Sequence, residues 1–285
     1  MADILAAAKF RALEDHVNLF AKGLWFALLV NGDPGSGKTT TVKACLVSHG
    51  LAEGKDFIVA TGYSTPLSLY KNLYLNNGRI IVFDDCDSVL TNKTTLGILK
   101  GALDDKDRRV VSYDSTSEKL GSIPNSFEFT GRVLIITNET FDTNDTDLKA
   151  VLNRCQHFQL RLTFKEKIDF TKNLIVPLAL NGSTLSQRKI CFQMVKQASV
   201  VSPENFSLRS FKKLLPLYLH DPNRFEDHLL QHFPASSESA LLIKVVKKHK
   251  VMKDACRAFM DEKKCSERTF WNARKRYAEL VSEVI

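Results

Sequence analysis

Residues 30–46 have the sequence VNGDPGSGKTTTVKACL, and this stretch decides the fold. It contains the spacing G-x-x-x-x-G-K-[ST] from Gly32 to Thr39. The apolar run LWFALLVN at 24–31 precedes the spacing and predicts a buried strand, and a helical pattern that ends at Gly50 follows it. Strand, glycine-rich turn and helix in this order favour a phosphate-binding loop over an ordinary βα turn.

The loop has the chemistry that a bound phosphate chain needs. Glycines permit a tight turn whose backbone N–H groups converge on phosphate oxygens, and the helix N-terminus adds the positive end of its dipole. We expect Lys38 to reach the β- and γ-phosphates and the Thr39 hydroxyl to bind Mg²⁺. The predicted nucleotide-binding residues are Gly32, Asp33, Pro34, Gly35, Ser36, Gly37, Lys38, Thr39 and Thr40.

A second apolar run, at 79–83, ends in two carboxylates. Ligands of open α/β sheets bind at the carboxyl ends of the strands, so this pair is expected beside the phosphate loop. Asp84 is predicted to hold Mg²⁺, mainly through water, and Asp85 to polarise the attacking water as a general base. The alternative is an acidic turn at a strand end. Asp87 is either a third carboxylate of the site or a helix cap.

A third apolar run, GRVLIITNET at 131–140, contains Asn138 near its end. A neutral amide there can orient the attacking water, or it can be a simple turn residue. The segment at 147–162 then predicts a short helix, followed by Arg154 and a last strand.

Together these pieces resemble the AAA+ family of ATPases. The matching motifs are GDPGSGKT, IIVFDD, LIITN and LNRCQHF, in the family's order. The resemblance covers about residues 24–165 and continues more weakly to NFSLRSF at 205–211. It implies a parallel sheet with helices on both faces, hydrolysis of ATP with Mg²⁺, and a hexamer-like ring or spiral of identical subunits.

The resemblance also implies roles for two arginines. Arg154 would project into the nucleotide site of a neighbouring subunit, where a trans arginine neutralises charge that develops in phosphoryl transfer. Arg209 would touch the γ-phosphate from the helical lid of the same chain. The alternatives are a surface arginine and a solvated helix arginine, and Arg132 with Arg108–Arg109 are rival candidates for the trans role.

Residues 105–131 are long for one connection, and RRVVSYDS and NSFEFTG within them predict two short strands. They favour a hairpin inserted before the third apolar run. In several branches of the AAA+ family, and in viral superfamily 3 helicases, a hairpin at this place touches DNA in the ring pore. Lys119 would be the tip residue; the alternative is a surface flap without DNA contact.

The sequence predicts three domains: an α/β core at 1–165, a helical lid at 166–235 and a basic C-terminal domain at 236–285. The stretch at 220–239 contains a Pro- and Ser-rich break, which is interpreted as the linker. The C-terminal domain holds twelve Lys and Arg against seven Asp and Glu, and so carries most of the chain's net charge of +8.

The C-terminal domain resembles a helix-turn-helix, with Ser266 as the N-cap of its last helix and Phe270 and Trp271 in its core. The alternative is a basic bundle that docks on a protein. On the first interpretation, three residues of the last helix face bases and three meet phosphates: Arg268, Thr269 and Asn272, then Arg274, Lys275 and Arg276.

Composition sets the remaining bounds. The chain has 285 residues, 44% of them hydrophobic and 25% charged, and its six Cys form no C-x-x-C pair. The amphipathic start differs from a signal peptide, and no window approaches the ~20 apolar residues of a membrane span. We therefore expect a cytoplasmic protein without a membrane partner, with a nuclear location as the alternative. We expect an ATPase that acts on DNA in phage-type replication, as helicase, loader or initiator, with another replication protein as a further partner. The alternative is a nucleotide-dependent switch with little hydrolysis.

Overall fold

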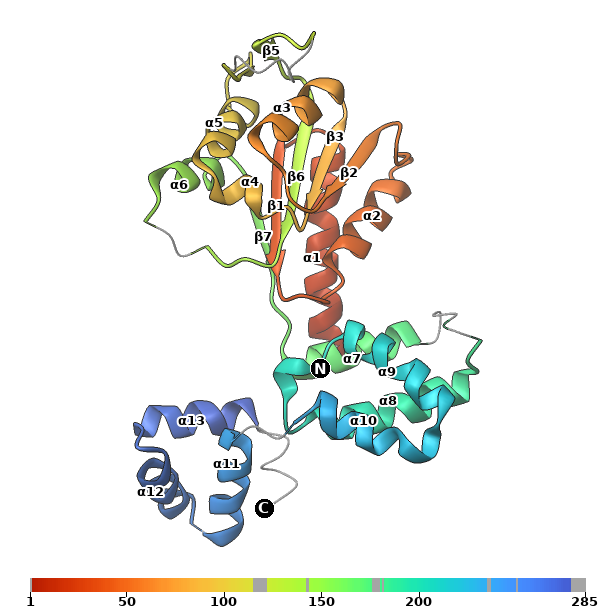
Figure 1. Cartoon of the computed structure of the whole chain (residues 1–285), viewed down its shortest axis with the longest axis vertical. Coiled ribbons are helices and arrows are strands. Elements are labelled where there is room, and N and C mark those ends of the chain that lie inside the picture. The colour runs from red at the N-terminus through yellow and green to blue at the C-terminus, as the bar shows by residue number, and fades with distance from the viewer. Residues whose placement is uncertain are drawn as a thin grey trace. The chain divides into compact units, whose positions relative to one another are not determined.

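The computed structural model describes residues 2–114, 122–141, 144–175, 180, 182–234, 237–249 and 251–277 (Figure 1). Contacts between residues divide the chain into two compact units, one formed by Ile4–Leu162 and the other mainly by Thr163–Ile285. Each unit has its own hydrophobic core, and the two are described separately below. In the described ranges, no helix combines the length and the apolar character that crossing a bilayer requires.

The first unit is built on a five-stranded parallel sheet. The phosphate-loop strand lies inside the sheet, with Val30 opposite Ile136 on one side and Phe158 on the other. The sheet confirms the predicted α/β class, and each predicted apolar run forms a strand. The strands in spatial order are β2 (Phe57–Thr61), β3 (Ile80–Asp84), β6 (Arg132–Thr137), β1 (Ala27–Gly32) and β7 (Gln156–Leu160).

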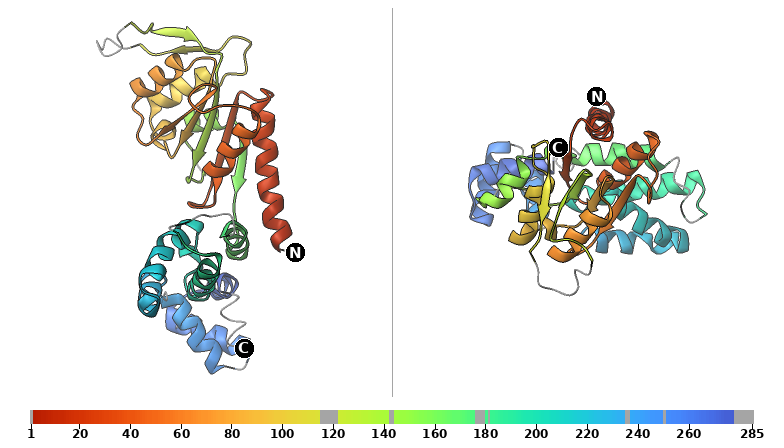
Figure 2. Two further views of the ribbon diagram at one scale, coloured as in Figure 1. Left: turned by 90° about the vertical axis from the view of Figure 1, so that its right-hand side faces the viewer. Right: turned by 90° about the horizontal axis from the view of Figure 1, so that it is seen from above.

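Helices cover both faces of this sheet (Figures 1 and 2). Successive side chains of a strand point to opposite faces, so Leu28 and Val30 of β1 enter one core and Leu29 enters the other. The first face is covered by α1 (Ala2–Ala21) and α2 (Lys38–Ser48). The second is covered by α3 (Pro66–Leu75), α4 (Ser88–Thr91), α5 (Lys93–Ala102) and α6 (Thr146–Leu152).

The N-terminal helix α1 packs on the sheet. Leu13, Val17 and Phe20 are fully buried, and their spacing places them on one face of the helix. Arg132 ties the end of α1 to β6, because its guanidinium donates a hydrogen bond of 2.9 Å to the carbonyl of Ala21.

The segment between α5 and β6 forms the predicted hairpin. Its strands β4 (Val110–Ser112) and β5 (Ser126–Glu128) pair antiparallel. Buried Arg109 anchors the hairpin base, since its guanidinium donates to the carbonyls of Ala102 (3.0 Å) and Gly131 (2.8 Å). Lys119, the predicted tip residue, lies outside the described residues.

The second unit begins with four helices: α7 (Phe164–Ile175), α8 (Leu185–Ser199), α9 (Leu208–His220) and α10 (Phe225–His232). Short 3₁₀ turns, η2 (Pro203–Asn205) and η3 (Pro222–Arg224), precede α9 and α10. Phe225, Leu229 and Phe233 are buried in the core of these helices, so the part of 220–239 that precedes the Pro- and Ser-rich break belongs to this helical unit. The Pro and Ser residues in this stretch end and start helices.

Three further helices complete the second unit: α11 (Ser237–Lys248), α12 (Met252–Lys263) and α13 (Glu267–Arg276). They share a core that includes Leu242, Phe259 and Phe270. Lys264 takes a left-handed conformation, with φ of 49°, and turns the chain between α12 and α13. The three predicted C-terminal helices are therefore present.

Candidate nucleotide-binding site

The loop between β1 and α2 has the backbone of a phosphate cradle. Gly35 and Gly37 have φ of 71° and 89°, a backbone conformation that residues with a side chain rarely adopt. A Cβ on Gly32 would lie 2.1 Å from the carbonyl oxygen of Leu160 on β7, so only glycine fits there. Gly37 is the N-cap residue of α2 and has no side chain to bond the first N–H groups of the helix, which therefore remain available to a ligand.

Lys38 is held at the centre of this loop. Its side chain is buried, and Nζ donates hydrogen bonds to the carbonyls of Gly32 (2.7 Å) and Asp33 (2.9 Å). A third bond, of 2.9 Å, goes to Oδ1 of Asn138 beyond the end of β6. The ammonium group thus joins the phosphate loop to the neighbouring strand end.

Ser36 supplies a test of whether the loop fits a phosphate group. Its hydroxyl oxygen is buried and has no hydrogen-bond partner among the described residues. A buried polar group without a partner costs about 1–3 kcal/mol. A phosphate oxygen at the cradle would offer this hydroxyl an acceptor, so the loop fits the group that the sequence implies. Of the remaining predicted loop residues, Pro34 and Thr40 are exposed.

Thr39 and Asp84 form the candidate magnesium site. The Thr39 hydroxyl donates to Oδ1 of Asp84 at 2.9 Å. Burial raises the pKa of Asp84, the hydrogen bond from Thr39 opposes this shift, and the nearby charge of Asp85 adds to it. A hydroxyl and a carboxylate fit Mg²⁺, which takes one or two protein oxygens and completes its shell with water and substrate phosphates.

Asp85 lies just beyond β3 and is exposed, so water can reach its carboxylate. Its φ of 51° turns the chain sharply out of the strand. Asn138 donates from Nδ2 to Oδ1 of Asp85 at 2.8 Å, while its own Oδ1 accepts from Lys38. The structure therefore brings together the predicted lysine, general base and amide in one hydrogen-bonded chain.

A group of polar residues that was not predicted from the sequence fixes the backbone on both sides of Asn138. Asn31, fully buried, donates to the carbonyl of Glu139 at 3.0 Å and contacts Nε2 of His157 at 3.0 Å. Thr137 donates to Asp87 at 2.5 Å and accepts from the N–H of Glu139 at 3.0 Å. Asn31 and Thr137 could have been noticed as polar residues that end apolar strands. His157 has no such sequence pattern.

The structure also decides the role of Asp87. It precedes α4, but its side chain makes no capping hydrogen bond. It accepts from Thr137 instead. Of the two predicted alternatives, the helix cap was wrong.

No family model and no curated protein matches this chain. Among solved structures, the P216G mutant of Thermotoga maritima RuvB matches with a TM-score of 0.50 and 14% identity, over 94% of this chain and 84% of that chain. The chain has the AAA+ ATPase fold. The Bacillus subtilis DNA clamp loader delta protein YqeN aligns over 91% of this chain and 71% of that chain, with 13% identity and a TM-score of 0.35.

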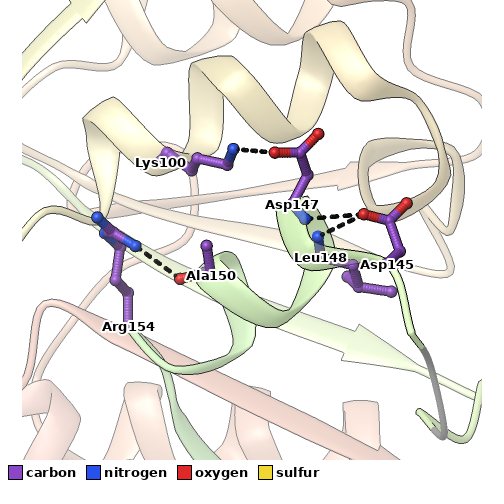
Figure 3. Close-up of polar contacts among 6 residues, drawn as sticks. All are labelled: Lys100, Asp145, Asp147, Leu148, Ala150 and Arg154. Atoms are coloured by element: carbon purple, nitrogen blue, oxygen red, sulfur yellow. Dashed lines mark hydrogen bonds and ion pairs between the residues drawn. The ribbon is translucent and has the colours of Figure 1, made fainter.

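Within this AAA+ fold, Arg154 follows α6 (Figure 3). Its Nη1 donates to the carbonyl of Ala150 at 2.8 Å, and its Nε lies 3.8 Å from the carboxylate of Asp104. Asp145 caps α6 through the N–H groups of Asp147 (2.8 Å) and Leu148 (3.2 Å). One-third of the Arg154 side chain remains exposed, so it is tethered at the surface of its own chain and not buried.

The rival arginines are engaged elsewhere. Arg109 is 5% exposed and its guanidinium lies 4.3 Å above the ring of Phe26. Arg132 bonds the carbonyl end of α1. Both are bound within the AAA+ core and are unsuited to reach another subunit. Arg108 pairs with Glu128 of the hairpin at 2.8 Å.

The lid residue Arg209 is exposed on the first turn of α9, where it lines a cavity of the second unit. Its role at the γ-phosphate stays a prediction.

The last helix, α13, has a buried and an exposed face. Phe270 and Ala273 are buried, and Arg268, Asn272 and Lys275 are exposed, whereas Thr269 and Arg274 are partly buried. Trp271 is 41% exposed, so its assignment to the core was wrong, and that of Phe270 is confirmed. Trp271 lies one position beyond the buried face.

Two further contacts on α13 bear on the predicted nucleic-acid face. Arg276 pairs with Glu238 of α11 at 3.0 Å. Ser266 occupies the N-cap position, but its hydroxyl contacts that of Thr269 at 3.1 Å and caps no backbone N–H.

Proposed function

We propose that this protein binds and hydrolyses ATP with Mg²⁺ at the loop from Gly32 to Thr40 and acts on DNA as an oligomer. One observation supports hydrolysis beyond nucleotide binding. Lys38, Asn138 and Asp85 form a continuous hydrogen-bonded chain that links the phosphate cradle to an exposed carboxylate. Phosphoryl transfer needs positioning and charge stabilisation more than covalent chemistry. In this hydrogen-bonded series, Lys38 would stabilise charge and Asn138 would position the Asp85 carboxylate.

Each residue of the site has a separable task. The N–H groups at the start of α2 and the Lys38 ammonium would bind phosphate oxygens. Thr39 and Asp84 would hold Mg²⁺, which neutralises phosphate charge when it is bound. Asn138 orients the Asp85 carboxylate through its Nδ2, and Asp85 accepts a proton from water as a general base.

Arg154 completes the proposed site from a neighbouring subunit. It is tethered but partly exposed, and its rivals Arg109 and Arg132 are bound within the core. A trans arginine needs a head-to-tail interface, which closes into a ring or continues as a spiral. We propose such an assembly, hexamer-like, with Arg209 contacting the γ-phosphate from the lid.

The DNA part of the proposal rests on charge. The C-terminal region has an excess of Lys and Arg, and α13 exposes Arg268, Asn272 and Lys275 on one helix. Phosphate contacts would give salt-dependent affinity, and base contacts would add sequence preference. The proposed task is phage-type DNA replication in the cytoplasm, as a helicase, loader or initiator working with another replication protein.

The test is ATP turnover with and without DNA, in wild type, Lys38→Ala and Arg154→Ala. We expect both variants to lose at least about a hundredfold in turnover, because each removes charge stabilisation from phosphoryl transfer. Mixing the two variants should restore part of the activity. An intact site forms where Arg154 of a Lys38→Ala subunit meets the loop of an Arg154→Ala subunit, which still carries Lys38. No recovery on mixing would exclude the shared site.

A second candidate function is a nucleotide-dependent switch with little hydrolysis. It is favoured by Asp85, a short carboxylate whose Oδ1 is engaged by Asn138. Wild type that binds ATP but turns over no faster than Lys38→Ala, with or without DNA, would establish the switch and exclude the ATPase.

A further inference from the structure

The second unit contains a cavity that the ATPase proposal leaves largely unexplained. It has a volume of about 400 Å³ and lies beside the N-terminus of α9 and the C-terminal end of α10. Seven of its eight lining side chains are polar or charged, so the cavity suits a polar ligand. The lining residues are Asn205, Ser207, Arg209, Ser210, Lys213, Gln231, His232 and Pro234.

The charge of the lining is positive. Arg209 and Lys213 are four residues apart on α9, a spacing that places them on one face. His232 contributes an imidazole from α10, and its pKa is lowered by burial and by the charge of Lys213. None of the eight lining residues carries a carboxylate. Arg209 and Lys213 therefore share one concave surface without a counter-charge in the lining.

The helix N-terminus adds to this positive potential. Ser207 caps α9, and its hydroxyl accepts the N–H of Ser210 at 3.1 Å. The N–H of Phe211 bonds the carbonyl of Ser207 at 3.1 Å. The cap thus leaves the N–H groups of Leu208 and Arg209, which precede the first intrahelical bonds, at the positive end of the helix.

We propose that this cavity binds a phosphate group, held by Lys213 and His232 at the start of α9. Pro234 is the one apolar residue of the lining, so a base or sugar finds little surface to pack on, and the phosphate is the recognised part. The phosphate belongs either to the backbone of a nucleic acid or to a nucleotide. Every lining residue lies in the second unit, so the site is complete without the loop of the first unit and does not depend on ATP hydrolysis.

The test uses the full chain with Lys38→Ala, which weakens phosphate binding at the other loop. Inorganic phosphate is titrated against chloride at matched ionic strength while the His232 imidazole is followed by NMR, with its resonance assigned from His232→Gln. We expect a saturable shift of this resonance. Lys213→Gln should weaken binding about tenfold, the loss expected for a charge-assisted hydrogen bond.

Lys212→Gln is the matched control, because Lys212 is the exposed neighbour on α9 and is absent from the lining. It should leave the affinity for phosphate unchanged. A shift that does not saturate, or an equal loss in both lysine variants, overturns the proposal. Thermal unfolding of each variant confirms that both are folded.

Two further arms identify the source of the phosphate. A short DNA strand and ATP are titrated separately against the same His232 resonance, in the Lys213→Gln and Lys212→Gln variants. A response to DNA that Lys213→Gln selectively weakens assigns the site to backbone phosphates, and the same pattern with ATP assigns it to the nucleotide. No selective response to either ligand overturns a biological role for the cavity. Because Lys38→Ala is present throughout, a failed ATPase proposal does not affect this result.

Discussion

Single residues in the first unit show how a few atoms position the candidate site. Lys38 bonds two carbonyls of its own loop and the amide of Asn138, so one ammonium group fixes the distance between two strand ends. Asn138 is in turn held by its neighbours, since Thr137 and Glu139 are bonded to Asp87 and Asn31. Networks of this kind rigidify a site, because removing one partner leaves others buried and unsatisfied.

Gly32→Ala is expected to destabilise the protein. The new Cβ would lie 2.1 Å from the Leu160 carbonyl oxygen, so β1 and β7 must separate at the phosphate loop. Overpacking of this kind costs about 1–3 kcal/mol or more, measured as the free energy of unfolding in urea. Gly97→Ala in α5 is the control. A Cβ there meets nothing within 4 Å, and alanine should stabilise the helix by about 0.5–1 kcal/mol. Equal effects of the two substitutions would contradict the steric argument.

Asp84→Asn should raise thermal stability at pH 7 and abolish Mg²⁺-dependent ATP turnover. Burial and the Asp85 charge raise the pKa of Asp84 in the folded state. Protonation therefore favours folding, and this contribution is lost as pH rises through the folded-state pKa. Asparagine removes the ionised group and keeps an acceptor for Thr39, so we expect a gain of roughly 1–3 °C at pH 7. The gain should shrink as pH falls through the raised folded-state pKa of Asp84 and vanish below the ordinary Asp pKa. A gain that is independent of pH would contradict the electrostatic cause.

At the scale of elements, the parallel sheet places functional side chains from distant sequence positions at one edge. The carboxyl ends of β3, β6 and β1 are neighbours in the sheet. Asp84 is the last residue of β3, Asn138 comes directly after β6, and Lys38 begins the helix that follows β1. Helix α6 performs a different task. Its capping by Asp145 and the ion pair between Lys100 and Asp147 hold it against α5, and this fixes the position of Arg154 (Figure 3).

Asp104→Asn should make Arg154 more available to a neighbouring subunit. The Asp104 carboxylate lies 3.8 Å from Nε of Arg154, and this attraction must be lost when the arginine reaches another site. Partly exposed pairs are worth up to about 1 kcal/mol, so the protein concentration that gives half-maximal turnover should fall by about two- to fivefold. Asp105→Asn, an exposed neighbour, serves as control. If both variants behave alike, Asp104 does not restrain Arg154.

At the scale of the whole molecule, the chain joins an α/β unit that carries the glycine-rich loop to a second unit whose described elements are helices and whose C-terminal region carries most of the net positive charge. On the proposed function, the first unit carries the chemistry and the second carries the recognition of DNA, and the two can be tested independently. The basic side chains of the helical unit differ in their availability to a ligand, because some of them, such as Arg276, form ion pairs within the unit.

Lys275→Gln should weaken DNA binding and lower the slope of log affinity against log salt concentration by about 0.9, the value for one phosphate contact. Arg276→Gln should lower the slope less, because Arg276 pairs with Glu238 at 3.0 Å within the fold. The measurement is DNA affinity at several salt concentrations between about 50 and 200 mM, and the slope is taken from a plot of log affinity against log salt concentration. Equal slopes for both variants would show that the ion pair does not restrict Arg276.

The sequence by itself determined the phosphate loop, the order of strands along the chain and the residues Lys38, Thr39, Asp84, Asp85 and Asn138 as one site. These followed because glycine spacing, apolar runs and strand-end polar residues are local patterns, and because a parallel sheet must bring its carboxyl ends together. The hairpin and the C-terminal helices followed from the same kind of local pattern.

Tertiary structure alone decided which side chains meet. It showed that Arg109 and Arg132 are bound within the core, that Asn31 and His157 support the segment around Asn138, and that Asp87 serves Thr137. These contacts join residues more than 20 positions apart, and no local pattern encodes such a distance. The helix at 225–232 was missed for a related reason: its Pro and Ser neighbours are typical of a linker, and burial of Phe225 against the other lid helices is what stabilises it.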